Sequence, residues 1–246
     1  MSKDIRLKKG LNINLQGEAD KVYASIPQSQ NFSIKPTDFH SLTPKMVVKE
    51  GDKVKAGSCL FFDKYDERIR FSSPVSGEVT EIVRGAKRRI MEVKITADSE
   101  ANYEIFSLDA KASREQVVKG LLESGVWPFI RQKPFDTIAN PSDNPKAIFI
   151  STFDTAPLAP DNDFVLHGLD KEFQLGIEVI KKLTDGKIHL NVDGNTNPSK
   201  VFTDCKGVEI NKISGPHPAG NVGVQVHHID PINKGDVIWY LYPQDV

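Results

Sequence analysis

The sequence predicts a mixed fold of two modules: a β-rich module over residues 1–108 and an α/β module over residues 109–246. Three observations support this prediction. Short apolar stretches, broken by Gly and Pro, fill residues 39–95 without any helical period. A helix-start signature then begins at Ser113. Further on, residues 147–192 follow a strand, helix, strand pattern, which is typical of a parallel sheet.

Within the first module, residues 48–57 and 74–82 share a pattern in which a glycine turn precedes a short valine strand. This duplication resembles the flattened barrel-sandwich of lipoyl and biotinyl carrier domains. The lead-in, residues 1–38, has turn signals around weak strands such as residues 11–15. We expect it to lead into the barrel or to pack along it.

In that carrier family the modified lysine lies at the tip of the hairpin between the two halves, and Lys64 falls near this tip. One hypothesis is therefore that Lys64 carries a lipoyl or biotinyl group. Two observations weigh against it. The neighbours Asp63 and Tyr65 stand where biotinyl domains have methionines, and the charged residues 65–68 predict a longer hairpin than lipoyl domains have. We expect Lys64 to be unmodified.

The second module begins with a capping box formed by Ser113 and Gln116, and Gly125 ends the predicted helix. The continuous apolar run at residues 147–150 predicts a strand that is covered on both faces. A broadly apolar helix around residues 173–183 and a strand at residues 188–192 complete a βαβ unit, so this module is predicted to be Rossmann-like.

Ligands of such a sheet bind at the carboxyl ends of the strands. Here the loop at residues 151–160 contains no glycine and two prolines, which lack an N–H, so it cannot cradle a phosphate in the usual way. Residues 215–220 imitate the spacing of a phosphate-binding loop, but Asn221 and Val222 follow where Lys and Ser or Thr are required. The sequence therefore predicts no tight binding of NADH or flavin.

The sequence predicts neither a metal site nor a catalytic residue in this chain. Cys59 and Cys205 are the only cysteines, and they are far apart. A late cluster of histidines and one aspartate suggests a metal site, but its adjacent pair is predicted to lie on a strand, where neighbouring side chains point to opposite faces. The cluster comprises His217, His227, His228 and Asp230.

Composition narrows the possible partners and the location. With 32 basic and 33 acidic side chains the formal net charge is −1, which provides no field for attracting nucleic acid. The start of the chain has no apolar stretch of the kind a signal peptide needs, and no apolar run is long enough to span a bilayer. We therefore expect a cytoplasmic location and no transmembrane segment.

Four longer stretches together resemble one family, the A subunit of the sodium-translocating NADH:quinone oxidoreductase. They are residues 124–135, 148–159, 214–227 and 239–246, which include the motifs G-V-W-P-F-I-R-Q-K-P-F and G-P-H-P-A-G. Family chains continue further, so the resemblance implies an N-terminal part of a longer protein.

The resemblance implies a peripheral subunit on the cytoplasmic side of the inner membrane, docked to a membrane-embedded subunit. The complex would pass electrons from NADH to ubiquinone and export sodium, with its NADH site, flavins and iron–sulfur centre in other subunits and no cofactor in this chain. The second module also resembles the flavin subunit of the proton-pumping NADH dehydrogenase, but Trp127, Phe129 and Arg131 replace its glycine-rich loop.

Two alternatives to this function stay open. One is a subunit of the related complex that oxidises ferredoxin, although such a subunit normally carries cysteine clusters. The other is the carrier domain modified at Lys64.

The segment after the capped helix contains the candidate contact residues. Trp127, Phe129, Arg131 and Phe135 combine large apolar rings with one cation, a set that suits a flat quinone or an apolar partner surface. Arg131 would donate to a quinone carbonyl. The competing interpretation is that the aromatic rings fill the space between the modules.

Overall fold

A computed structural model describes residues 2–17, 19–109 and 111–246, which form two compact units. The β unit comprises Ala24–Ile130 and Asp136–Ala139. The α/β unit comprises the chain up to Tyr23, then Arg131–Phe135 and Asn140–Val246. This partition differs from a single division between residues 108 and 109, because the N-terminal segment belongs to the α/β unit and the capped helix to the β unit.

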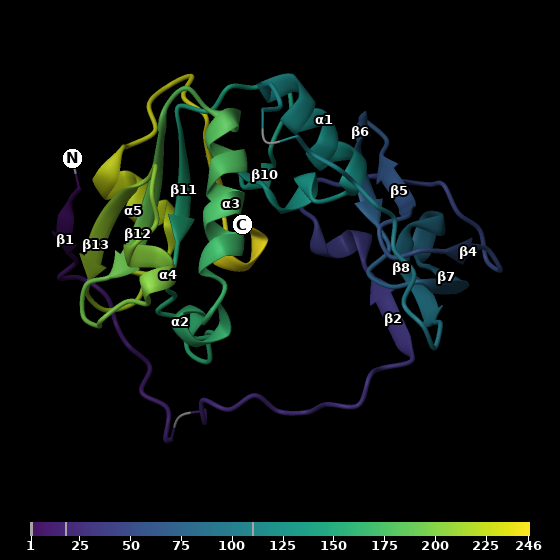
Figure 1. Ribbon diagram of the computed structural model, residues 1–246, viewed down its shortest axis with the longest axis horizontal. Coiled ribbons are helices and arrows are strands. Elements are labelled where there is room, and N and C mark those ends of the chain that lie inside the picture. The colour runs from purple at the N-terminus through teal and green to yellow at the C-terminus, as the bar shows by residue number, and fades with distance from the viewer. Residues whose placement is uncertain (1, 18, 110) are drawn as a thin grey trace. The chain divides into compact units, whose positions relative to one another are not determined.

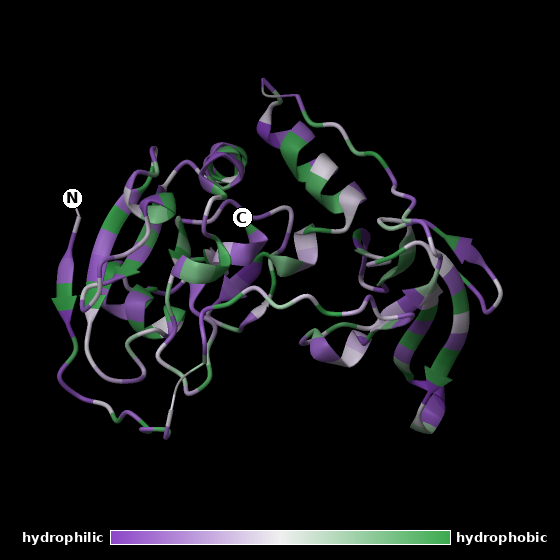
Figure 2. Cartoon of the chain, turned by 60° about the horizontal axis from the view of Figure 1, so that its bottom comes forward, coloured by the Kyte–Doolittle hydropathy of each residue, from purple (hydrophilic) through white to green (hydrophobic). Residues whose placement is uncertain are grey.

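The β unit contains two antiparallel sheets (Figure 1), with strand orders β2-β8-β7-β4 and β3-β5-β6. Apolar and polar residues alternate along the strands (Figure 2), and the apolar side chains form the core. The elements of this unit are β2 (Asn31–Ile34), η1 (Pro36–Asp38), β3 (Pro44–Met46), β4 (Lys53–Val54), β5 (Cys59–Asp63), β6 (Asp66–Ser72), β7 (Gly77–Arg84), η2 (Ala86–Arg88), β8 (Ile90–Ala97), α1 (Arg114–Ser124), η3 (Trp127–Phe129) and β10 (Thr137–Ile138).

Two glycines explain the repeated turns that the sequence shows in this unit. Gly51, in the turn before Val54, has a φ of +88°, a left-handed conformation that residues with a side chain rarely adopt. Gly77 begins β7 so close to β8 that a Cβ atom there would lie 2.0 Å from the carbonyl oxygen of Thr96. The turn glycines are therefore fixed by backbone geometry and by close strand packing.

The hairpin at Lys64 is shorter than the sequence predicted. Asp63 pairs directly with Asp66, which leaves Lys64 and Tyr65 as a two-residue turn. The predicted lengthened hairpin is wrong because residues 66–68 belong to β6 despite their charge. Their strand continues into the buried Ile69 and Phe71, so the apolar half of β6 fixes the register of the charged half.

Helix α1 begins and ends where the sequence predicted. The Ser113 hydroxyl accepts from the backbone N–H of Gln116, whose side chain accepts from the Ser113 N–H at 2.8 Å. Gly125 ends the helix in the left-handed conformation with a φ of +77°. A Cβ at Gly125 would lie 2.1 Å from the Ser72 hydroxyl, which donates to the carbonyl of Ser124 at 3.1 Å. Both the conformation and this contact with β6 require glycine.

The α/β unit is built on a sheet with the order β1-β13-β12-β11-β14-β9. Its pairings are parallel except that β9 runs antiparallel to β14. The elements are β1 (Asp4–Arg6), β9 (Arg131–Lys133), β11 (Ala147–Ser151), α2 (Asn162–Val165), α3 (Asp170–Ile180), η4 (Lys181–Leu183), β12 (Lys187–Asp193), α4 (Lys200–Thr203), β13 (Glu209–Ser214), α5 (Val222–Ile229), β14 (Ile238–Leu241) and η5 (Pro243–Asp245).

The two faces of this sheet have different cores. On one face, Ala147 and Phe149 of β11 pack in one apolar cluster with Val222, Val226 and Ile229 of α5. Alternate residues of the same strand, such as Ile148 and Ile150, point to the opposite face and are fully buried there. Helix α3 runs alongside β11 (Figure 1). The predicted βαβ unit is confirmed, since β11 and β12 are parallel and α3 lies between them in sequence.

The order of the strands reverses between β11 and β14. From β11 the chain steps outward to β12 and β13, and it then returns through α5 to place β14 on the other side of β11. In doubly wound sheets such a reversal leaves a crevice at the carboxyl ends of the two strands, and ligands bind there.

The N-terminal segment follows the α/β unit, and the expectation that it packs along the barrel is wrong for its first part. β1 pairs with β13, and the Leu7 N–H donates to the carbonyl of Ser214 at 2.8 Å. The predicted weak strand at residues 11–15 is absent from the described chain, and Leu11 instead donates its N–H to the carbonyl of His217 at 3.0 Å.

No helix among the described residues is long and apolar enough to cross a membrane.

Candidate functional site

Two of the four predicted contact residues lie in the β unit, and they differ in exposure. Trp127 is fully buried, and its Nε1 donates to the carbonyl of Ala139 at 2.8 Å, so it is a core side chain. Phe129 is 46% exposed, and its ring meets that of Phe39 edge-on with centroids 6.4 Å apart. Only Phe129 of this pair presents an apolar ring to the surface.

The other two contact residues lie in the α/β unit. Arg131 is half-buried in β9, opposite Tyr240 of β14. Lys133, two residues on, places its ammonium group 5.1 Å from the centre of the Tyr240 ring. Phe135 follows this strand and is 79% exposed. The four predicted residues are thus divided between the two units, with Trp127 inside a core and Phe135 on the surface.

A cavity lies in the α/β unit where the strand order reverses, between β11 and β14. None of its lining residues was among the candidate site residues of the sequence analysis. We call this cavity the switch-point crevice. Its volume is about 240 Å³, and its walls come from the end of β11, the loop after it, the start of α2, the loop before α5 and the residues after β14. The lining residues are Ser151, Phe153, Asp154, Pro160, Asn162, Gly220, Tyr242 and Gln244. Only the loop at residues 151–160 could be expected from sequence, because it follows a buried parallel strand.

Two loops meet closely at this crevice. A Cβ atom on Gly220 would lie 2.5 Å from the backbone nitrogen of Thr155, so only glycine fits there. The Gly220 N–H donates to the Thr155 hydroxyl oxygen at 3.0 Å, and that hydroxyl lies 3.1 Å from Nδ1 of His217. Gly220 therefore serves to join the two loops rather than to cradle a phosphate.

A row of buried polar side chains runs from the crevice across the sheet under α5. Gln225 Nε2 donates to the Ser151 hydroxyl at 2.8 Å, and its Oε1 accepts from Asn191 Nδ2 at 2.8 Å. Asn211 Nδ2 donates to Asn191 Oδ1 at 2.9 Å and lies 3.3 Å from Nδ1 of His189. All five side chains are nearly inaccessible to solvent. Burial lowers the pKa of the His189 imidazole, so at neutral pH the row carries no charge.

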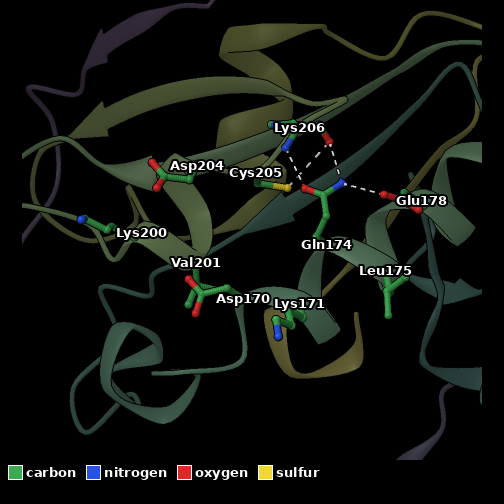
Figure 3. A pocket seen from close by; sticks show the side chains of 10 residues that line it. All are labelled: Asp170, Lys171, Gln174, Leu175, Glu178, Lys200, Val201, Asp204, Cys205 and Lys206. Atoms are coloured by element: carbon green, nitrogen blue, oxygen red, sulfur yellow. Dashed lines mark hydrogen bonds between the residues drawn. The ribbon is translucent and has the colours of Figure 1, made fainter.

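A second and larger cavity lies between α3 and α4 (Figure 3), with a volume of about 630 Å³. Gln174 spans it, accepting from the N–H of Lys206 at 2.9 Å and donating to the carbonyl of the same residue at 3.4 Å. Burial raises the pKa of the Cys205 thiol to about 11, which keeps it a neutral, weak nucleophile at physiological pH. We call this cavity the α3–α4 groove.

The late histidines do not lie on a strand, so the prediction of a strand there is wrong. His227 and His228 belong to α5, with ring centres 5.1 Å apart. Nowhere in the described chain do three or more His, Cys, Asp or Glu side chains gather as a metal site would need.

Comparison with known proteins identifies the family. Two family models match the chain: "NqrA N-terminal barrel-sandwich hybrid domain" over residues 5–98 and "NqrA second alpha/beta domain" over residues 112–246. The predicted barrel-sandwich and α/β fold is thereby confirmed.

Similar curated proteins include the A subunit of the Na(+)-translocating NADH-quinone reductase of Photorhabdus laumondii, 36% identical over 98% of this chain and 55% of that protein. The protein of that name from Neisseria meningitidis is 35% identical, again over 98% and 55%. The one from Rhodopirellula baltica is 33% identical over 98% and 54%. The chain thus spans about half the length of these relatives, and it belongs to the NqrA family.

Proposed function

We propose that the protein acts as a peripheral subunit of a sodium-translocating NADH:quinone reductase, on the cytoplasmic side of the membrane and docked to a membrane-embedded subunit. The observation that carries this proposal is the agreement of both family models with relatives named as the A subunit of such a reductase. The NADH site, flavins and iron–sulfur centre would lie in other subunits, and this chain would hold no redox centre of its own. The family match also disfavours a subunit of the ferredoxin-oxidising complex.

Within that complex, we propose that the surface part of residues 129–135 contacts quinone or the membrane-embedded subunit. Phe129 and Phe135 are 46% and 79% exposed, and each ring provides apolar area that a quinone or a partner surface would cover. Arg131 lies between them in sequence and would donate to a quinone carbonyl. Trp127 is removed from the set because its indole is fully buried and bonded to Ala139.

The test uses the assembled complex in native membranes. Arg131→Ala and Phe135→Ala should each lower the rate of quinone reduction about fivefold or more, while oxidation of NADH by an artificial acceptor stays unchanged. Matched controls are Arg84→Ala and Tyr65→Ala, which remove an exposed cation and an aromatic ring that is 78% exposed elsewhere on the chain.

Each variant is also measured for assembly by affinity purification of the complex. Unchanged assembly and unchanged rates for both test variants would refute the contact proposal. The subunit proposal fails separately, if the full-length protein does not co-purify with any membrane protein of the reductase.

A further inference from the structure

We infer that the switch-point crevice is a binding site for an uncharged or cationic heteroaromatic compound that carries N–H donors, of the kind a purine nucleoside represents. The crevice lies where the strand order reverses between β11 and β14, the position at which doubly wound sheets bind ligands. This inference is independent of the proposed quinone contact, because none of the residues at 129–135 lines the crevice.

The crevice offers acceptors from Asn162 and Asp154 beside donors from Tyr242 and Gln244. Asn162 is only 9% exposed, and its Nδ2 donates to the carbonyl of Thr152 at 3.1 Å, which leaves its Oδ1 for a ligand donor. Asp154 accepts the N–H of Ala156 with one carboxylate oxygen, and the other is open. No lysine, arginine or histidine is among the lining residues. A ligand with N–H groups therefore finds partners here, whereas an anion meets a carboxylate without a compensating cation.

Three backbone N–H groups near the crevice, those of Ala156, Gly220 and Gly223, already have partners. The Gly220 N–H is bonded to Thr155, as described above. The next loop residue, Asn221, uses its side chain to cap the N–H of Gly223 at 3.2 Å, and the Ala156 N–H is held by Asp154 at 2.8 Å. An anion site at a helix start needs free N–H groups, so these bonds, together with the Asp154 carboxylate in the lining, disfavour a phosphate at this edge of the sheet. The expected ligand is thus a nucleoside-like compound rather than a nucleotide or dinucleotide.

The walls and the volume agree with a compound of this size. Phe153 and Tyr242 both line the crevice, and aromatic side chains of this kind stack with flat heterocycles. The volume of about 240 Å³ equals that of roughly eight liquid waters and lies below the range of pockets for drug-sized ligands. A dinucleotide is too large for it.

The test is an NMR titration of the ¹⁵N-labelled chain with adenosine and, in parallel, with AMP, which differs only by the phosphate. Adenosine should shift the amide signals of Ser151, Asn162 and Gly220 with a Kd of about 0.1–1 mM. AMP should bind at least about tenfold more weakly, because its dianion faces Asp154. FMN should cause no saturable shift at these amides.

Three variants locate the site. Asp154→Asn removes the charge but keeps an oxygen for the Ala156 N–H, and it should reduce the preference for adenosine over AMP to below about threefold. Tyr242→Ala should weaken adenosine binding about fivefold by removing one aromatic wall. Leu175→Ala, in the α3–α4 groove, is the matched control and should change neither affinity.

Three results would overturn the inference: no amide shift with adenosine up to about 10 mM, shifts confined to the α3–α4 groove, or AMP binding as tightly as adenosine. Retained amide dispersion in each variant shows that the chain is still folded, so a lost affinity is not mistaken for unfolding.

Discussion

The buried polar row beneath α5 makes a quantitative prediction about stability. Asn191 makes two hydrogen bonds in a site closed to water: it donates to Gln225 Oε1 at 2.8 Å and accepts from Asn211 Nδ2 at 2.9 Å. Asn191→Leu removes both. A hydrogen bond contributes about 1 kcal/mol net, and a buried partner left without one costs about 1–3 kcal/mol more. Asn191→Leu should therefore destabilise the α/β unit by about 2–5 kcal/mol. Gln225→Leu should destabilise it similarly, because Asn191 Nδ2 loses its acceptor.

The double variant Asn191→Leu/Gln225→Leu decides whether these costs come from unpaired groups. Replacing both partners leaves fewer orphaned atoms than the two single changes combined, so the double variant should lose less than their sum by at least about 1 kcal/mol.

The assay is urea unfolding followed by Trp239 fluorescence in a Trp127→Phe background. The chain has two tryptophans, and Trp239 is the buried one of the α/β unit, so its signal reports that unit alone. Unchanged m-values would show that each variant changes stability rather than the unfolded state. Losses below about 0.5 kcal/mol for both single variants, or strict additivity in the double variant, would contradict a continuous, water-free polar row.

Two further predictions concern Lys64 and His189. Lys64 lies in a two-residue turn, and its neighbours are Asp63 and Tyr65 rather than methionines, so intact-mass measurement of protein from the native cell should show no lipoyl or biotinyl addition. Either added mass would establish the carrier alternative. Burial lowers the pKa of His189 from its usual 6.5, so the unfolded chain takes up this proton at a higher pH than the folded one. The stability linked to His189 is thus present above about pH 6.5 and is lost as the pH falls. In the same urea assay, the His189→Gln variant should lose less stability than the wild type between about pH 7 and pH 5. Equal losses would exclude His189 as the cause.

Local signals predicted the elements that local contacts define. The Ser113 capping box and Gly125 fixed both ends of α1, and the unbroken apolar run at residues 147–150 identified β11. Such features depend on a few consecutive residues, so they are visible in one sequence.

Helix α5 was predicted as a strand because its apolar residues fit both the two-residue period of a strand and the longer period of a helix. Val222, Val224 and Val226 alternate as in a strand, and β-branched residues favour that interpretation. The helix is nevertheless set by Asn221, which caps its start, and by the buried positions Val222, Val226 and Ile229 at a spacing of four and then three residues. The Asn221 cap is the signal that could have corrected the assignment.

The crevice and the polar row could not be predicted from short stretches of the sequence. Their members come from β11, β12, β13, the loops around α2 and α5, and the residues after β14, and only the strand order brings these segments together. The same holds for β1, whose partner strand begins about 200 residues later.

The interleaved partition of the chain has a consequence for synthesis on the ribosome. Most of the β unit, Ala24–Ile130, emerges as one stretch, and its last piece, Asp136–Ala139, follows within a few residues. The α/β unit instead includes β1, whose partner strand β13 is translated only after the whole of the β unit. The β unit can therefore fold while the nascent chain is still growing, but β1 must wait for its partner until residues 209–214 have been made. A premature stop before β13 would release a folded β unit whose β1 segment lacks its partner strand.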